Sequence, residues 1–230
     1  MKTIKGIWRF SRVICYTFVC LFQAYTRFKR VDRKEKGRML RYYPTQVLKL
    51  AGVRCSYEGN VPELLHECGL TDTPPAYMVL SNHISWLDIF SLDSQLPSRF
   101  IAKAEIAKWP VFGLIAQQIG TLFINRSSKR AILRINDDIR GALCNCEAVT
   151  IFAEGTTTFG NELLPIKANF IAPACEIGAT VQPVILSYKN KGKPTKRAAF
   201  AGDVTLFGSL WNVVTMEDAE VVVHFLEPIT

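Results

Sequence analysis

The feature that most constrains this chain is the alternation of short apolar runs with longer amphipathic ones after residue 55. The short runs have the length and the β-branched or aromatic content of strands, and the longer ones carry apolar residues at helical spacing. Strands that alternate with helices favour an α/β fold, in which a mixed, mostly parallel sheet is flanked by helices. The sequence predicts strands at 76–80, 99–102, 121–124, 149–153, 181–186 and 220–226, and helices at 87–96, 106–118, 128–147 and 168–177.

Length and composition agree with this fold. The chain has 230 residues, 49% of them hydrophobic, which is enough to bury the core of one ordinary domain. Fourteen Gly and eleven Pro are close to average usage, and no fixed-period repeat is present. These observations exclude disordered, collagen-like and solenoid proteins.

Positive charge is concentrated in the first fifth of the chain. Residues 1–50 hold thirteen Lys or Arg against two acidic residues, a net +11, while the whole chain carries +8, so residues 51–230 carry −3. The charge brackets an apolar stretch at 13–24, which a nucleic-acid-binding arm has no reason to carry, so we expect no nucleic-acid partner. We divide the chain into basic-apolar, membrane-associated helices at 1–50 and an α/β domain at 51–230.

The apolar stretch has three interpretations. As a helix its twelve residues span only about 18 Å, against roughly 30 Å of hydrocarbon, so a half-inserted or in-plane membrane helix fits better than a spanning one. A secretory signal peptide is a second interpretation, but residues 23–27 offer no small-x-small cleavage site. A buried core helix is the third.

A second basic-apolar helix is predicted at 34–50, and Pro44 should kink it or end its first part. Two such helices in succession form a plausible interfacial hairpin, with cations directed toward anionic lipid. The alternative is a basic helix that packs on the domain with its charges in water.

Seven cysteines are scattered along the chain without the C-x-x-C pairs of zinc or redox sites. An odd number of such thiols, expected to be mostly buried, indicates a reducing compartment. Together with the membrane-associated segment, this predicts a location on the cytoplasmic face of the cell membrane. We predict no metal site and no cofactor.

His83 is the strongest candidate for a catalytic residue among the three histidines, because His224 falls inside a predicted strand and His66 on a predicted helix surface. His83 follows an apolar strand and is followed five residues later by Asp88. Five residues of continuous helix would hold the two side chains apart, whereas a helix that begins after Ser85 would let Asp88 reach the imidazole. Such a pair fixes the histidine tautomer and creates a general base.

Helix capping gives an alternative role to the same residues. Ser85-x-x-Asp88 resembles a capping box, in which the serine caps the helix and the aspartate accepts from the backbone in return.

A second candidate loop follows the strand at 149–153. Glu154, Gly155 and Thr156 supply a carboxylate, a glycine that permits close backbone approach, and a hydroxyl, a combination suited to a polar or phosphorylated group. An ordinary strand-to-loop turn is the alternative. Between the two loops lie Lys103 and Arg126, and the Arg126 guanidinium can pair with a phosphate or form a surface salt bridge.

Taken together, these segments resemble the glycerolipid and lysophospholipid acyltransferase family, which includes 1-acylglycerol-3-phosphate acyltransferases. Four ordered motifs, spread over about residues 76–188, carry the resemblance. They are Asn82-His83-x4-Asp88; Lys103-x-Glu105 through Pro110, Gly113, Gly120 and Phe123-Ile-x-Arg126; Phe152-x-Glu154-Gly155-Thr156 with Leu164-Pro165-x-Lys167; and Val181-Gln182-Pro183-Val184.

The resemblance implies acyl transfer from acyl-carrier protein or acyl-CoA to a lysolipid hydroxyl, without a covalent acyl-enzyme. It makes His83 the general base, oriented by Asp88, and Lys103 or nearby backbone amides candidates for oxyanion stabilisation. It assigns the acceptor's head group to Arg126, Glu154, Gly155 and Thr156. Bacterial relatives carry an N-terminal helical hairpin, so the membrane surface becomes an expected partner. Residues 51–230 are then the acyltransferase catalytic domain.

The acceptor is less sharply indicated than the reaction. Many lysophosphatidate enzymes have Arg directly after Glu-Gly-Thr, where this chain has Thr157. The hydroxyl-rich loop and the segment 202–211 are similar to the branch that includes lyso-ornithine lipid acyltransferases. Because Arg126 is present, 1-acylglycerol-3-phosphate is the first choice and a lyso-ornithine lipid the alternative. Two other classes of protein are alternatives, a lipid hydrolase and a non-catalytic membrane-binding module. The sequence lacks the G-x-S-x-G elbow that would present a hydrolase's nucleophilic serine.

Overall fold

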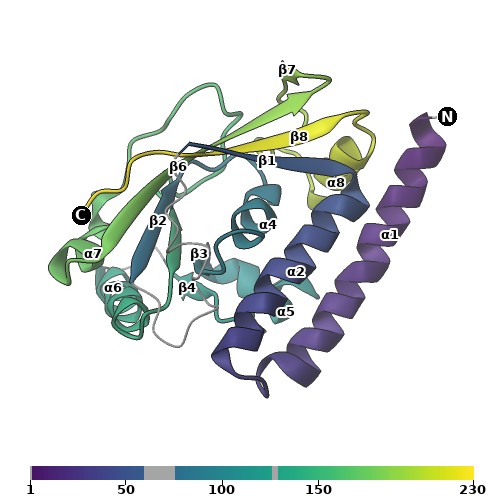
Figure 1. Cartoon of the computed structure of the whole chain (residues 1–230). Coiled ribbons are helices and arrows are strands. Elements are labelled where there is room, and N and C mark those ends of the chain that lie inside the picture. The colour runs from purple at the N-terminus through teal and green to yellow at the C-terminus, as the bar shows by residue number, and fades with distance from the viewer. Residues whose placement is uncertain (1, 60–75, 126–128) are drawn as a thin grey trace.

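A mixed sheet with helices on both faces forms the body of the molecule in the computed structural model, which describes residues 2–59, 76–125 and 129–230 (Figure 1). Its eight described strands run in the order β1-β8-β6-β2-β5-β3-β4, with β7 paired to β6. All pairs are parallel except β6 with β8 and β6 with β7. The α/β fold with a mostly parallel sheet is therefore confirmed. The strands are β1 (Val53–Gly59), β2 (Tyr77–Ser81), β3 (Arg99–Lys103), β4 (Leu122–Ile124), β5 (Val149–Phe152), β6 (Thr180–Asn190), β7 (Lys193–Pro194) and β8 (Ala219–Phe225).

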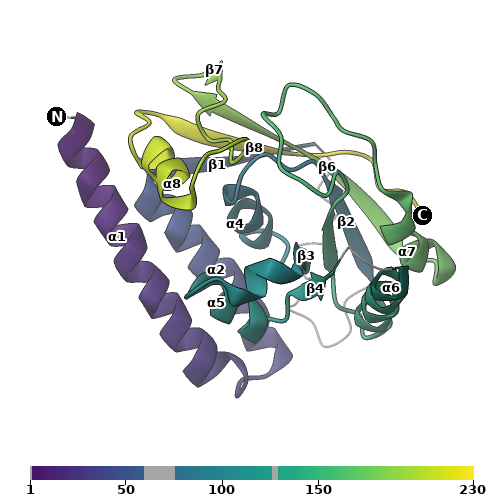
Figure 2. The same cartoon turned by 180° about the vertical axis from the view of Figure 1, so that it is seen from behind.

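The helices separate into two layers, one on each face of the sheet (Figures 1 and 2). They are α1 (Lys2–Gln23), the π-helical η1 (Ala24–Phe28), α2 (Arg33–Ala51), α4 (Leu87–Asp93), the 3-10 helix η2 (Ala104–Lys108), α5 (Phe112–Gln118), α6 (Lys129–Cys144), the 3-10 helix η3 (Ala168–Phe170), α7 (Ala172–Glu176) and α8 (Leu206–Val214). Strand β2 shows why two layers form. Tyr77 and Val79 belong to the core shared with α2, α4 and α8, whereas Met78 belongs to the core under α6 and α7.

All six predicted strands are present, but two predicted helices are divided. The expected helix at 106–118 is split into η2 and α5 by a tight turn at Val111. Val111 has φ 65° and ψ −62°, and the Phe112 amide donates to the Pro110 carbonyl at 2.7 Å, as in a γ-turn. Helix 168–177 is likewise divided, into η3 and α7. Strands β1 and β7 were not predicted.

Helix α2 continues through Pro44, so of the two expected effects, a kink or an end, the end at Pro44 is wrong. Proline removes the backbone donor that would bond the Leu40 carbonyl, and Pro44, Val47 and Leu48 are buried. Asp32 caps the start of the helix by accepting from the Glu35 amide at 2.7 Å. Burial of one face stabilises this helix more than the proline destabilises it.

Helix α1 has one buried side and one exposed side. Val13 and Thr17 are buried, and Arg9 donates to the carbonyls of Val214 and Met216 at the end of α8. The outer side carries large exposed apolar side chains at helical spacing, namely Ile4, Ile7, Trp8, Phe18, Val19 and Phe22. None of the described helices is both long enough and apolar enough to cross a bilayer.

The expectation that the cysteines are mostly buried is wrong for the six that the structure describes. Cys15, Cys144 and Cys175 are exposed and the other three are partly exposed. All six thiols are free. The exposed cysteines lie on helices α1, α6 and α7.

Candidate active site

Three parallel strands end at one edge of the sheet and bring the predicted site residues together. Strand β2 ends at Ser81 and leads into the turn with His83, β5 ends at Phe152 and leads into the loop with Glu154, and β3 ends at Lys103. Strand β5 pairs with both β2 and β3. The carboxyl ends of parallel strands are the usual place for a ligand site in this kind of fold.

His83 and Asp88 form the predicted pair. The His83 Nδ1 atom lies 2.8 Å from Asp88 Oδ2. The Asp88 side chain is completely buried and that of His83 is 18% exposed. Helix α4 begins at Leu87, so His83 lies in the turn before the helix and Asp88 in its first turn, as expected. Because Asp88 engages Nδ1, the opposite ring nitrogen, Nε2, is left to face other groups.

Asp88 also bonds the backbone at the start of the helix, so the contact with His83 and the capping-box contacts are both present. Its Oδ2 atom accepts from the backbone amides of Ile84 at 2.7 Å and Ser85 at 2.9 Å. The Ser85 hydroxyl accepts from the Leu87 amide at 3.3 Å. The same carboxylate therefore shapes the turn and holds the imidazole, which means that the backbone conformation and the ring orientation are fixed together.

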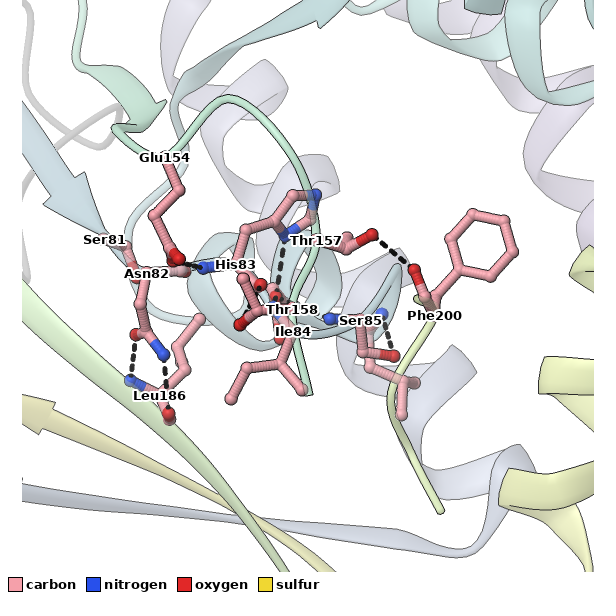
Figure 3. Close-up of polar contacts among 12 residues, drawn as sticks. Ser81, Asn82, His83, Ile84, Ser85, Glu154, Thr157, Thr158, Leu186 and Phe200 are labelled. Carbon is pink, nitrogen blue, oxygen red and sulfur yellow. Dashed lines mark hydrogen bonds and ion pairs between the residues drawn. The ribbon is translucent and has the colours of Figure 1, made fainter. Parts of the chain in front are cut away.

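The turn that carries His83 is held on several sides (Figure 3). The His83 amide donates to Glu154 Oε1 at 2.9 Å, and its carbonyl accepts from the Thr158 amide at 2.8 Å. The imidazole stacks on the Phe152 ring with 3.8 Å between centroids and 8° between planes. The ring has its partner at the end of β5, and the amide and carbonyl have theirs in the loop that follows (the β5 loop), which leaves His83 little freedom to reorient.

Glu154 is buried beneath the site, with 3% of its surface exposed. Its second oxygen, Oε2, accepts from the Leu164 amide at 3.1 Å. In this structure the carboxylate ties the His83 turn to the loop that follows β5. The expectation that Glu154 contacts a head group stays a prediction.

The rest of the β5 loop reaches the surface of the site. Gly155 has φ 72°, a conformation that favours glycine, and both Gly155 and Thr156 line the cavity described below. The Thr157 hydroxyl donates to the Phe200 carbonyl, and the Phe200 amide donates to the Ile84 carbonyl at 2.8 Å. Thr157 thus joins the loop to the segment before α8.

His83 lies in the wall of a cavity of about 690 Å³. The cavity is lined mostly by apolar side chains, and α1 and α2 contribute part of its wall, including Val13, Met39 and Val47. Lys103, Phe100 and Phe152 line it as well. A long apolar substituent can therefore lie beside the His83 imidazole.

The other predicted residues are placed as follows. Lys103 is exposed and shares the cavity with His83. Arg126 and His66 lie outside the described residues. His224 lies on β8, a strand remote from the cavity lining. Its side chain is 43% exposed and lies 3.5 Å from that of Glu58.

Three contacts of the site were not predicted. The Phe152 ring stacks on His83, and the Tyr188 hydroxyl donates to Asp88 Oδ1. The Asn82 side chain clamps the backbone of Leu186, donating to its carbonyl at 3.0 Å and accepting from its amide at 2.7 Å. A signal for Tyr188 was available, because Val184, Leu186 and Tyr188 alternate along one buried face of β6. The strand predicted at 181–186 stopped too early to include it.

The relatives found by comparison with known proteins are named as acyltransferases. A 1-acyl-sn-glycerol-3-phosphate acyltransferase of Neisseria gonorrhoeae is 43% identical over 154 residues, 66% of this chain and 60% of that protein. The match thus spans about 60% of that relative's length. A lyso-ornithine lipid O-acyltransferase of Pseudomonas aeruginosa is 40% identical over 150 residues, 65% of this chain and 58% of that protein. One of Rhizobium meliloti is 32% identical over 212 residues, 86% of this chain and 69% of that protein.

The solved structures give a similar fold. The crystal structure of the 1-acyl-sn-glycerophosphate (LPA) acyltransferase PlsC from Thermotoga maritima superimposes with a TM-score of 0.66 at 18% identity, covering 100% of this chain and 87% of that one. The acyltransferase family model matches residues 55–187, which include His83, Asp88, Lys103 and the β5 loop. The chain therefore belongs to the acyltransferase family.

Proposed function

We propose that this protein is a membrane-associated, acyl-thioester-dependent lysolipid O-acyltransferase. The observation that carries the proposal is the His83–Asp88 pair, 2.8 Å apart, in the wall of a large apolar cavity. The names of the relatives support transfer of an acyl group to a lysolipid, with 1-acylglycerol-3-phosphate as the first acceptor to test.

His83 acts as the general base. Asp88 accepts a hydrogen bond from the Nδ1–H group, which fixes the tautomer and leaves Nε2, on the opposite side of the ring, with a free lone pair. Nε2 takes the proton of the acceptor hydroxyl as its oxygen attacks the thioester carbonyl. The buried negative charge of Asp88 stabilises the imidazolium that forms.

The remaining steps use groups that share the cavity. The tetrahedral intermediate places negative charge on the former carbonyl oxygen, and Lys103 is the proposed donor to this oxyanion. When the intermediate collapses, the carbon–sulfur bond breaks and the leaving thiolate takes the proton from His83. The products are the acylated lipid and the free thiol carrier, and no acyl-enzyme forms.

In this proposal the acceptor's head group binds to Arg126, Gly155 and Thr156. Glu154 holds the loop that carries Gly155 and Thr156. Gly155 and Thr156 border the cavity that His83 lines, which supports a polar group seated beside the reacting hydroxyl. The apolar depth of the cavity suits an acyl chain.

The exposed apolar side of α1 supports association with the cytoplasmic face of the cell membrane. Trp8, Phe18 and Phe22 project from the molecule, and residues 1–50 carry a net +11. A helix with these properties lies in the interface of an anionic membrane. Because α1 and α2 also line the cavity, a docked protein would open its site close to lipid. On this basis we keep residues 1–50 as the membrane-associated segment and residues 51–230 as the catalytic domain.

A lyso-ornithine lipid is the second candidate acceptor. The observation in its favour is that the Rhizobium meliloti match extends over 86% of this chain. Either acyl-carrier protein or acyl-CoA can serve as donor. The exposed basic side chains of Lys191, Lys193, Lys196 and Arg197 give an acidic carrier protein a surface to contact.

One assay tests the proposal. Purified full-length protein is incubated in anionic vesicles with lysophosphatidate or a lyso-ornithine lipid, each with acyl-carrier protein and CoA thioesters. We expect an acylated lipid in stoichiometric amounts with released thiol. Release of free fatty acid without acylated lipid would indicate a hydrolase, and no turnover with any pair would indicate a binding module.

A further inference from the structure

Tyr188 is a buried polar residue that the mechanism above does not use. It lies on β6 with only 4% of its surface exposed, and its hydroxyl donates to Asp88 Oδ1. Burial and the neighbouring Asp88 carboxylate hold the pKa of the Tyr188 phenol well above its usual value near 10. The hydroxyl therefore keeps its proton and remains a donor at neutral pH.

The sheet brings Tyr188 to this place. Strands β2 and β6 pair in register until Ser81 meets Val184, after which β2 ends and β6 continues to Asn190. The Asn82 side chain holds the β6 backbone at Leu186, two residues before Tyr188. Because side chains alternate along a strand, Leu186 and Tyr188 point to the same side, beneath the start of α4. The extension of β6 thus serves the His83 turn.

The two oxygens of Asp88 have different partners. Oδ2 accepts from the Ile84 amide, the Ser85 amide and His83 Nδ1. Tyr188 is the described donor to Oδ1. Hydrogen bonds to a buried carboxylate disperse its charge and fix its plane. Loss of the phenol donor would leave the negative charge on Oδ1 less dispersed and the plane of the carboxylate less fixed, while the three bonds to Oδ2 keep the carboxylate beside the imidazole.

We propose that Tyr188 is a positioning residue for His83, which acts through Asp88 by fixing the plane of the carboxylate and moderating its attraction for the protonated imidazole. The inference deepens the proposed function, on which it rests for its kinetic test. It assigns a role in the reaction to a residue from a strand that carries none of the predicted site residues.

The test uses Tyr188→Phe in the full-length protein. We expect the acidic limb of the pH profile of kcat/KM to move to higher pH by roughly 0.5–1 unit, because a less solvated Asp88 carboxylate stabilises the imidazolium more strongly. We also expect kcat to fall several-fold while KM for both substrates stays the same. Tyr57→Phe is the matched control, because its phenol is bonded to the Ser94 hydroxyl at 2.6 Å and does not contact the pair.

A second variant keeps the test valid if Tyr188→Phe fails to fold. Replacing Tyr188 with 3,5-difluorotyrosine preserves the shape and strengthens the donor, so the acidic limb should move to lower pH. Opposite displacements in the two variants support the proposal. Profiles that coincide with wild type in both, or that move equally in Tyr57→Phe, overturn it and leave Tyr188 a packing residue.

A readout without turnover separates this inference from the proposed function. The chain has only three histidines, so the His83 ring can be followed by nuclear magnetic resonance during a pH titration. The midpoint of the His83 signal should move upward in Tyr188→Phe even if no substrate is found. An unmoved midpoint would overturn the role of Tyr188, whereas a moved midpoint without any transfer activity would count against the acyltransferase proposal alone.

Discussion

The His83 turn and helix α1 are opposite kinds of structure in one molecule. At the turn, the His83 amide, carbonyl and ring all have partners within the fold, and Asp88 is completely buried. Along α1, large apolar side chains project outward, with Phe18 57% and Phe22 63% exposed. At the turn, the amide, carbonyl and ring of His83 have their partners within the protein. Helix α1 instead exposes apolar surface to water.

The contrast agrees with the roles proposed for the two regions. Reaction chemistry needs a ring held in one orientation, which buried hydrogen bonds and stacking provide. Contact with a membrane needs apolar area and positive charge without a fixed partner. Changes at the turn should therefore reduce turnover and leave membrane binding intact, and changes along α1 should do the reverse.

Asp88→Asn should give the largest effect at the turn. The amide oxygen can replace Oδ2 toward the Ile84 and Ser85 amides, so the turn is kept, but the negative charge that stabilises the imidazolium is lost. We expect kcat to fall roughly 10²- to 10⁴-fold. Steady-state kinetics measures it, with Asp137→Asn on the exposed side of α6 as control. Wild-type turnover would leave Asp88 with a capping role only.

Lys103→Met tests the proposed oxyanion donor. Removal of one such donor typically costs roughly 10²- to 10³-fold in kcat, and an exposed lysine should give the lower end of this range or somewhat less. The measurement is kcat at saturating concentrations of both substrates. Lys108→Met, five residues away on η2, controls for lost charge, and an equal effect in both variants would refute a specific role for Lys103.

Substitutions on α1 should produce the reverse pattern. Phe18→Ser combined with Phe22→Ser removes two exposed rings, and we expect the vesicle partition coefficient to fall roughly 10- to 100-fold. Turnover of short-chain, water-soluble substrates should stay unchanged. Leu133→Ser is the control, since Leu133 is 66% exposed on α6, on the other face of the sheet. Sedimentation with anionic vesicles that is identical for all three proteins would contradict the membrane role of α1.

The smallest expected effect is a pH dependence of stability that comes from Asp93. Burial raises the pKa of this carboxyl well above its usual value near 3.8, although the Ser98 amide donates to it at 3.1 Å. The folded protein thus holds a proton that the unfolded chain releases, so stability falls as pH rises above about 4, by at most about 1.4 kcal/mol per pH unit, until the raised pKa is reached.

The matched variant for this prediction is Asp93→Asn, which keeps an acceptor for the Ser98 amide but has no proton to lose. Urea unfolding at several pH values should show its stability advantage over wild type increasing with pH. A difference that stays constant with pH would show that Asp93 is ionised in the folded protein.

Much of the fold follows from the sequence because strands and helices have distinct periods. All six predicted strands and the helix at 128–147 are present, with small shifts in their ends. Prediction failed where local patterns compete with tertiary contacts. Pro44 lies inside α2 because that part of the helix is buried, and Val111 interrupts a helical pattern with a backbone turn that apolar periodicity does not reveal.

The site was predictable in part for a similar reason. The His83–Asp88 contact follows from a helix that starts between the two residues, which spacing can suggest. The stacking of Phe152 on His83 and the donation by Tyr188 depend on which strands are neighbours in the sheet. Strand order is set by long-range pairing, and one sequence gives little information about it.

The most direct test of the central claim measures His83→Ala for acyl transfer and vesicle binding in the same preparation, beside His224→Ala. The account predicts that transfer falls roughly 10²- to 10⁴-fold while vesicle binding matches wild type, and that His224→Ala retains both. Transfer at the wild-type rate by His83→Ala would contradict the account, because the His83–Asp88 pair at the cavity wall would then have no part in moving the proton.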